Sequence, residues 1–256
     1  MFTLAPSALL AVSALSLAAS QQPAPKADAP AAAPVAPTAS APAAAEPAMA
    51  DGAAWVPGVP VGFKLPDIST IQIRGAESKL SINYKNRPAV VVFYRGGWCP
   101  YCVQNLKLWS VNLDAVRQAG ANLVAISPEK IVNLLEVQKK HNLAMPLVTD
   151  YEGQAAKAFN VNFTLDAETQ ANYTKAGLNL ADRSSRGTWD LPVPATFVVD
   201  TDGTVLWAHA DKDYTKRASP KEVIEFLTAR KARIAADAAA AKKDAPAPQP
   251  APDAKK

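Results

Sequence analysis

The sequence is poor in side chains that bind metals, with two cysteines and two histidines among its 256 residues. A structural zinc site takes four ligands of this kind. His141 and His209 are far apart in the sequence and show no paired spacing with each other or with the cysteines. We therefore predict no metal site and no cofactor, and both histidines are expected to be ordinary structural or surface residues.

The sequence also has no excess of charge of one sign, because 27 Lys and Arg residues face 23 Asp and Glu residues, for a net charge of +4. It contains no basic run interleaved with aromatic residues, the pattern typical of nucleic-acid binding. After the first 20 residues no apolar run has the length of a membrane span. We predict no nucleic-acid partner and no membrane span in the mature chain.

The first 20 residues, MFTLAPSALLAVSALSLAAS, are mostly apolar and uncharged. A short apolar centre followed by small residues such as Ala18 and Ser20 is typical of a secretory signal peptide, although the usual basic start is missing. We predict that residues 1–20 are a signal peptide and that the protein is exported to the periplasm.

Two segments, 21–54 and 242–256, consist almost entirely of Ala, Pro, Lys, Asp and small polar residues. They contain too little bulky apolar surface to offset the entropy of ordering the chain, and proline lacks a backbone donor. We predict a disordered linker over 21–54 and a disordered tail over 242–256. Residues 55–241 between them are rich in Val, Leu, Ile and aromatics and are expected to form one domain.

Hydrophobic periodicity and capping signals within this domain predict alternating strands and helices. The strands are expected at 88–94, 121–126, 146–148, 195–199 and 204–210, the helices at 100–118, 128–140, 153–159 and 220–241, and a hairpin within 60–80. Asp200-Thr-Asp-Gly203 predicts a hairpin turn, and Ser219-Pro-Lys-Glu222 predicts a capping box that opens the last helix. Residues 164–190 show no assignable pattern. This order predicts an α/β domain with a mixed central sheet and helices on both of its faces.

Both cysteines lie in FYRGGWCPYC (93–102), between the predicted strand 88–94 and the helix that follows it. The N-terminus of a helix presents free N–H groups and a partial positive charge, which lower the pKa of a nearby thiol. Cys99 is expected at the very start of the helix, Pro100 in its first turn, and Cys102 one turn inside, within reach of Cys99. A redox-active pair is the favoured interpretation. A weakly stabilising structural disulfide and two inert buried thiols stay open as alternatives.

The sequence resembles the peroxiredoxin-like branch of the alkyl hydroperoxide reductase / thiol-specific antioxidant family, within the thioredoxin superfamily. The matching segments are VVVFYRGGWCPYC, ISPEK and LPVPATFVVDTDGTVLWAHADKDYTKRASPKEVIEFL, which cover most of 59–227. The resemblance implies a thioredoxin fold. It also implies that Pro194, after Val193, is a cis-proline that faces the cysteines and leaves neighbouring backbone groups free for a substrate; Pro192 is the rival for a turn role.

Typical members of this family use a Pro, a Thr and a peroxidatic Cys from one motif, together with a distant Arg. Alignment of FYRGGWCPYC on that motif puts Arg95 at the Pro, Cys99 at the Thr and Cys102 at the peroxidatic Cys, while Pro194 takes the place of the Arg. Only one of the four residues is kept. These departures favour dithiol–disulfide exchange, with Cys99 as the attacking thiol and Cys102 as the resolving one.

Two other functions stay open. In a thiol-dependent peroxidase, Cys102 is oxidised by peroxide and Cys99 resolves it. In a non-catalytic binding module, the cysteines form a permanent structural disulfide. The partners of the two enzymes are a thiol, disulfide or peroxide substrate and a redox partner protein.

Several residues near the cysteines have two interpretations. Trp98, Tyr94 and Tyr101 are expected either to form an apolar rim around the sulfurs or only to pack the core. Arg95 is expected either beside the thiolate or on the surface at the end of a strand. The segment 164–190 either covers the active site or is a surface excursion.

Overall fold

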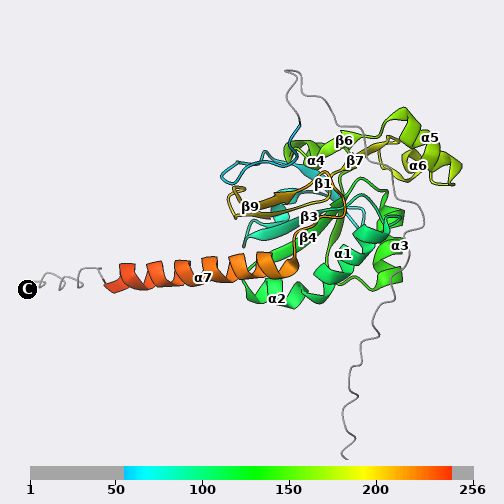
Figure 1. The fold of residues 1–256 in the computed structure, drawn as a ribbon. Coiled ribbons are helices and arrows are strands. Elements are labelled where there is room, and N and C mark those ends of the chain that lie inside the picture. The colour runs from blue at the N-terminus through cyan, green and yellow to red at the C-terminus, as the bar shows by residue number, and fades with distance from the viewer. Residues whose placement is uncertain (1–54, 244–256) are drawn as a thin grey trace, which may run out of the picture. The chain divides into compact units, whose positions relative to one another are not determined.

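The structure is a computed structural model, and it describes residues 55–243 (Figure 1). The predicted signal peptide (1–20), the predicted linker (21–54) and residues 244–256 of the predicted tail lie outside the described residues. Residues 242 and 243, which were assigned to that tail, instead end the last helix.

A seven-stranded mixed sheet forms the centre of the domain, in the order β2-β1-β5-β4-β3-β8-β9. β3, β4 and β5 run parallel, and the other neighbouring pairs are antiparallel. The strands are β1 (Ser69–Gln72), β2 (Glu77–Lys79), β3 (Ala89–Phe93), β4 (Asn122–Ser127), β5 (Leu147–Thr149), β8 (Ala195–Val199) and β9 (Val205–Ala210). The predicted mixed sheet is confirmed, as is the predicted hairpin before β3.

The strand that leads to the cysteines, β3, lies in the middle of the sheet and is buried along its whole length. Its β-branched sequence, AVVVF, suits a strand covered on both faces. It pairs with β4 on one side and β8 on the other, so the chain towards the cysteines starts from a strand that is hydrogen-bonded on both sides.

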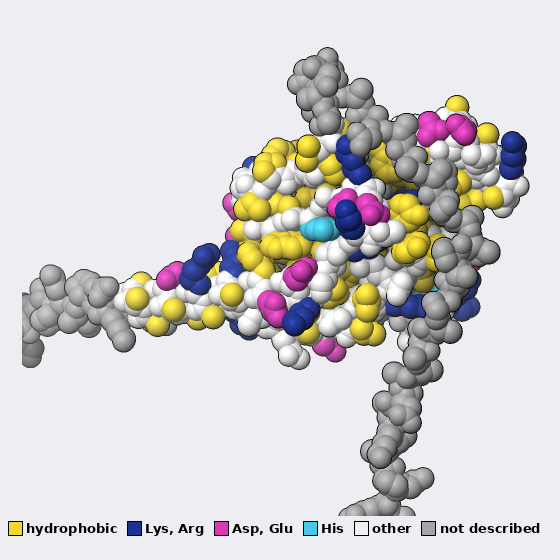
Figure 2. Space-filling model, viewed as in Figure 1, with side chains coloured by type: hydrophobic (Ala, Val, Ile, Leu, Met, Phe, Trp, Pro, Cys, Tyr) yellow, Lys and Arg dark blue, Asp and Glu magenta, His cyan; other side chains and the backbone are white. Residues whose placement is uncertain are grey.

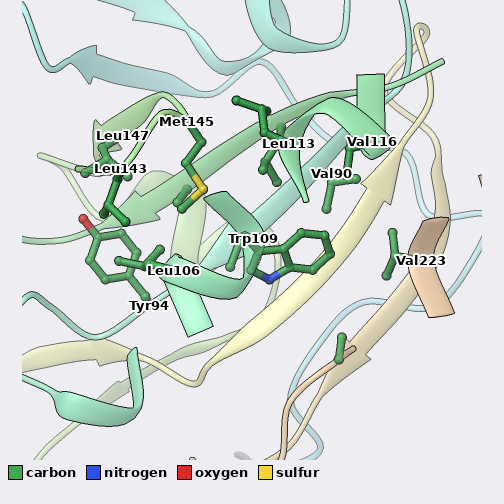
Figure 3. Close-up of a cluster of buried hydrophobic side chains, with 14 of the residues drawn as sticks. Val90, Tyr94, Leu106, Trp109, Leu113, Val116, Leu143, Met145, Leu147 and Val223 are labelled. Carbon is green, nitrogen blue, oxygen red and sulfur yellow. The ribbon is translucent and has the colours of Figure 1, made fainter. Parts of the chain in front are cut away.

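Helices cover both faces of the sheet (Figure 1). On one face lie α1 (Pro100–Val111), α2 (Leu113–Gln118), α3 (Ile131–His141) and the start of α7 (Pro220–Lys243). α4 (Gln154–Ala158) lies on the other, and a one-turn helix, η1 (Leu80–Asn83), precedes β3. The first face packs around Trp109, Leu106, Met145 and Val223 (Figure 3), in the same cluster that holds both cysteines.

Two helices differ from the prediction in their bounds. The expected helix 100–118 is interrupted at Asn112, so α1 and α2 are separate. The expected helix 128–140 begins only at Ile131, because residues 128–130 pair with the chain around Ser184. The Lys130 N–H donates to the carbonyl of Arg183 at 2.8 Å, and this tertiary pairing holds the segment extended.

The segment 164–190, which showed no sequence pattern, contains regular structure. β6 (Asn162–Thr164) and β7 (Asp190–Pro192) form a separate two-stranded sheet, and α5 (Ala167–Lys175) and α6 (Leu180–Arg183) lie between them. Both helices are short and each begins at an Asx cap, Asp166 for α5 and Asn179 for α6. We call α5, α6 and the chain that joins them to β7 (residues 166–189) the insertion.

The last two predicted features of the domain are confirmed. The turn at 200–203 joins β8 and β9, and Gly203 has a φ of +87°, a conformation that favours glycine. At the start of α7 the Ser219 N–H donates to the carboxylate of Glu222, as a capping box requires. No helix among the described residues is both long and apolar enough to cross a membrane.

Charges of both signs are mixed on the surface. Figure 2 shows Lys and Arg side chains next to Asp and Glu side chains over the described part of one face. Several ion pairs among the described residues join exposed partners, for example Lys64 with Asp202 and Arg117 with Asp114. Such pairs contribute little stability.

Candidate active site

The two cysteines lie at the N-terminus of α1, as predicted from the sequence. Cys99 is the N-cap residue and Pro100 occupies the first turn. The Cys99 Sγ accepts a hydrogen bond from the Cys102 N–H at 3.4 Å, which places both sulfurs at the positive end of the helix. Both residues are free thiols and both are completely buried.

Arg95 reaches the sulfur pair from the end of β3. Its Nη2 donates to the Cys99 Sγ at 3.2 Å, and the side chain is 5% exposed. The guanidinium lies 4.1 Å from the ring centroid of Tyr214 and 5.3 Å from that of Trp98, so aromatic faces cover it. The interpretation of Arg95 as a surface residue is therefore wrong, and its place beside the thiols is the one that the structure supports.

A second arginine, Arg217, approaches the other sulfur. It comes from the loop between β9 and α7, and its Nη2 lies 3.5 Å from the Cys102 Sγ. Its Nε donates to the carbonyl of Tyr214 at 3.0 Å, which fixes the direction of the guanidinium. The sequence reasoning missed Arg217. Nothing in DKDYTKRAS distinguishes it from the neighbouring Lys216, because only the fold brings it to Cys102.

The surrounding charges act differently on the two thiols. Burial raises the pKa of Cys102, but a hydrogen bond from Cys99 and the positive charges of Arg217 and Arg95 outweigh burial and bring that pKa well below its usual value. The hydrogen bond to Cys102 and burial raise the pKa of Cys99. These directions favour the proton on Cys99 and the negative charge on Cys102.

Aromatic side chains from three segments gather around Arg95, the residue that contacts the Cys99 Sγ. Trp98 makes an edge contact with Tyr173 of α5, at a centroid distance of 5.9 Å, and Tyr101 makes one with Tyr214, at 5.4 Å. The predicted rim of Trp98 and Tyr101 around the sulfurs stays a prediction. Tyr94 is fully buried in the core cluster that also holds both cysteines (Figure 3), so this side chain packs the core.

The turn before the cysteines has no room for side chains. A Cβ on Gly96 would lie 2.3 Å from the Trp98 Nε1 and 2.8 Å from the Glu129 Cδ, and one on Gly97 would lie 2.9 Å from the Val137 Cβ. The glycine pair therefore allows Trp98 and Glu129 to close over the turn. The reasoning from sequence did not assign a role to Glu129, although it lies in the quoted segment ISPEK.

The expected cis-proline is not found. The Val193–Pro194 peptide bond is trans, like every other peptide bond among the described residues. The chain passes in extended form from β7, which ends at Pro192, into β8, so the path needs no sharp turn at Pro194. The Val193 N–H is also not free for a substrate, since it donates to the carbonyl of Val161 at 2.7 Å.

Pro194 nevertheless belongs to the surroundings of the site. It is buried and, with Asn105 of α1 and Arg217, lines a narrow pocket beside β8. The two histidines are ordinary structural residues: His141 ends α3, and His209 lies on β9 and stacks on Trp207. Over the described range, no three His, Cys, Asp or Glu side chains gather as a metal site.

Comparison with known proteins gives this arrangement a family. The model of the AhpC/TSA family matches residues 61–208, which is more than half of the chain. The chain belongs to the AhpC/TSA family. Peroxiredoxin Bcp of Bacillus subtilis is 25% identical to it over 169 residues, which span 66% of this chain and 93% of that protein.

Solved structures share the fold of this AhpC/TSA protein. Peroxidoxin BcpB from Mycobacterium tuberculosis has a TM-score of 0.53 and 20% identity, over 66% of this chain and 96% of that one. Peroxiredoxin Q from Xanthomonas campestris has a TM-score of 0.51 and 19% identity, over 66% and 97%. The predicted thioredoxin fold and the predicted peroxiredoxin-like relationship are confirmed, and the AhpC/TSA protein is a peroxiredoxin-like oxidoreductase.

The sequence named Cys102 as the candidate peroxidatic residue of a peroxidase, and this assignment stays a prediction. In the structure each sulfur has its own guanidinium group: the Arg217 Nη2 lies 3.5 Å from the Cys102 Sγ, and the Arg95 Nη2 lies 3.2 Å from the Cys99 Sγ. The resemblance puts Pro194 where the family has an Arg, and in the structure Arg217 supplies a guanidinium group near Cys102.

Proposed function

We propose that the protein is a thiol-dependent peroxidase in which Cys102 attacks the peroxide and Cys99 resolves the product. The observation that carries this proposal is the charge around the Cys102 Sγ: the Arg217 Nη2 lies 3.5 Å away, and the positive charges of Arg217 and Arg95 lower the pKa of this thiol. This proposal takes the alternative in which Cys102 is the attacking residue, and leaves exchange initiated by Cys99 as the second candidate.

Burial also supports a small substrate. Neither cysteine is exposed. A protein disulfide has to bring its own sulfur into line with the attacking thiolate. A hydroperoxide needs to present only its two oxygens, so it requires a smaller opening at the buried sulfur than a protein disulfide does.

The proposed reaction has two steps. The Cys102 thiolate attacks the terminal oxygen of the hydroperoxide, the O–O bond breaks, and the alkoxide leaves and takes up a proton to become an alcohol. Cys102 is then a sulfenic acid. The Cys99 thiol displaces its hydroxyl as water and forms the Cys99–Cys102 disulfide. A dithiol reductant returns two electrons and two protons and restores both thiols.

Dithiol–disulfide exchange is the second candidate, and one contact favours it. The Arg95 Nη2 lies 3.2 Å from the Cys99 Sγ, closer than Arg217 lies to Cys102, and can also favour a thiolate on Cys99. In this case Cys99 attacks an external disulfide and Cys102 releases it.

Single substitutions of the cysteines separate the two candidates. Hydroperoxide consumption and reduction of a model disulfide are measured for Cys99→Ser and Cys102→Ser, each with a small monothiol as reductant. We expect Cys102→Ser to lose hydroperoxide consumption and Cys99→Ser to keep it while the monothiol is present. Without the monothiol, Cys99→Ser should accumulate a sulfenic acid on Cys102 that dimedone traps.

The opposite pattern identifies an exchanger. If Cys102→Ser forms a stable mixed disulfide through Cys99 while neither the variants nor the unmodified protein consume hydroperoxide, the peroxidase proposal is wrong. If Cys102→Ser consumes hydroperoxide as fast as the unmodified protein, the assignment of the attacking sulfur is wrong.

A further inference from the structure

Glu129 is a buried carboxylate next to the sulfur site to which the proposed reaction gives no task. It follows β4, and its side chain is 2% exposed. Its Oε2 accepts a hydrogen bond from the Gly97 N–H at 2.7 Å, and its Oε1 accepts one from the Arg183 Nε at 2.7 Å. One carboxylate thus connects the turn before Cys99 with the last residue of α6.

The hydrogen bond from the Gly97 N–H to Glu129 lies in the turn that leads to Cys99. The Cys99 N–H donates to the carbonyl of Gly96 at 3.2 Å, so residues 96–99 form a turn whose second residue is held by Glu129. The absence of a Cβ on Gly96 lets the carboxyl carbon of Glu129 approach closely. The Cys99 Sγ stands directly after this turn, with its N-cap contact to Cys102 at 3.4 Å.

The second contact comes from the insertion. Arg183 is 29% exposed, and its partner is the buried carboxylate. The backbone around it is fastened to the chain near Glu129, because the Lys130 N–H donates to the Arg183 carbonyl and the Ser185 N–H donates to the Pro128 carbonyl. Tyr173 of the same insertion touches Trp98. The insertion therefore meets the active-site turn at two places.

Arg183 favours the charged form of Glu129. Burial raises the pKa of Glu129 above its usual value, while the Gly97 N–H and Arg183 oppose this rise. A buried carboxylate that loses its cation is expected to take up a proton, and a neutral carboxyl group is a weaker acceptor for the Gly97 N–H than a carboxylate.

We propose that Glu129, held by Arg183 of the insertion, is the positioning residue for the resolving thiol of Cys99. This inference rests on the proposed peroxidase reaction and concerns its second step. The insertion then belongs to the active site, because it keeps Cys99 in line with the sulfenic acid on Cys102. The disulfide can therefore form before a second peroxide oxidises Cys102 to a sulfinic acid.

A pair of arginine substitutions tests this role. Arg183→Gln removes the partner of Glu129. Arg186→Gln is the matched control, because Arg186 lies in the same insertion, is similarly exposed and forms an ion pair with Asp190 at 2.9 Å without contact to Glu129. Each full-length protein receives one equivalent of hydrogen peroxide, and the lifetime of the sulfenic acid is followed by dimedone trapping and mass spectrometry.

We expect Arg183→Gln to lengthen the lifetime of the sulfenic acid by about tenfold, since an ångström-scale misplacement of a reacting group costs up to about a hundredfold in rate. In a parallel sample with excess hydrogen peroxide, sulfinic acid on Cys102 should increase, while the rate of the first oxidation stays unchanged. Arg183→Lys should restore the lifetime, and Glu129→Gln should reproduce the defect. Arg186→Gln should behave like the unmodified protein.

The result that overturns the inference is an equal sulfenic acid lifetime in Arg183→Gln, Glu129→Gln and Arg186→Gln. A slower first oxidation with an unchanged lifetime also overturns it, because Glu129 would then act on Cys102 and not on Cys99. Failure of the proposed function looks different: the unmodified protein itself would form no sulfenic acid on Cys102.

Discussion

Cys99 and Cys102 are close neighbours at the start of one helix, yet their surroundings give them different chemistry. Cys102 lies in the first turn of the helix and has Arg217 at its side, while Cys99 caps the helix and has Arg95. A pair of coupled thiols that faces two guanidinium groups is expected to lose its first proton easily and to hold the second one tightly.

The first prediction is a thiolate at low pH. The pKa of Cys102 is well below its usual value, so the ultraviolet absorbance of the thiolate should appear at a pH below the ordinary cysteine pKa of about 8.5. A lowered pKa stabilises the folded state above the pKa of the unfolded chain, and this stability is lost as the pH falls through the folded pKa. Peroxide reduction should decline over the same low-pH range.

Arg217→Gln tests whether Arg217 causes the lowered pKa of Cys102. The substitution should raise the pKa of Cys102 and lower the rate of peroxide reduction by about a hundredfold, the cost of removing one charged donor at a reacting centre. Lys216→Gln is the control, since this neighbouring lysine is 64% exposed and pairs only with surface aspartates. Equal titration curves for both variants would mean that Arg217 does not act on the thiolate.

At the scale of the element, α7 consists of two unlike halves. Its first half packs Val223 and Leu227 into the core and ends with Arg230, which pairs with Asp200 at 2.7 Å. From Lys231 onwards every described side chain is exposed, including Ile234. The second half should therefore contribute little to the stability of the domain.

Two truncations test this division of α7. Removal of residues 232–256 should change the free energy of unfolding by less than about 0.5 kcal/mol, as is usual for surface changes. Removal of 227–256 also deletes Leu227 and Arg230 and should cost more than about 2 kcal/mol, by comparison with the loss of other buried leucines. Urea denaturation measures both. A large loss from the shorter truncation would show that the exposed half packs against another part of the protein.

At the scale of the whole molecule, the folded chain favours the reduced state of the pair. Arg95, Arg217 and the N-terminus of α1 all stabilise a negative sulfur, and this charge disappears when the disulfide forms. A disulfide whose reduced form is stabilised is more oxidising. The disulfide also closes a loop of a few residues and constrains the unfolded chain very little.

The reduction potential measures this balance. We expect a value between about −120 and −270 mV, the range of catalytic dithiol pairs, by equilibration with thiol buffers. A potential below about −300 mV would indicate an inert structural bond and would support the non-catalytic binding module that the sequence left open. Arg217→Gln should shift the potential to a more negative value, because it removes a charge that favours the reduced form.

Much of the architecture was determined by local patterns in the sequence. The β-branched run of β3, the turn at 200–203 and the capping box at Ser219 were all assigned from the chain alone, and each was confirmed. The same is true of the cysteines at the start of α1. These features depend on residues within a few positions of each other, so periodicity and capping suffice to predict them.

The chemistry around the sulfurs was decided only by the tertiary structure. Arg217 reaches Cys102 across 115 positions of the chain, and Arg183 reaches Glu129 across 54. The trans bond at Pro194 and the displaced start of α3 likewise follow from how distant segments pair. Charge, burial and hydrogen bonding are properties of neighbours in space, and a single sequence does not state which residues become neighbours when the chain folds.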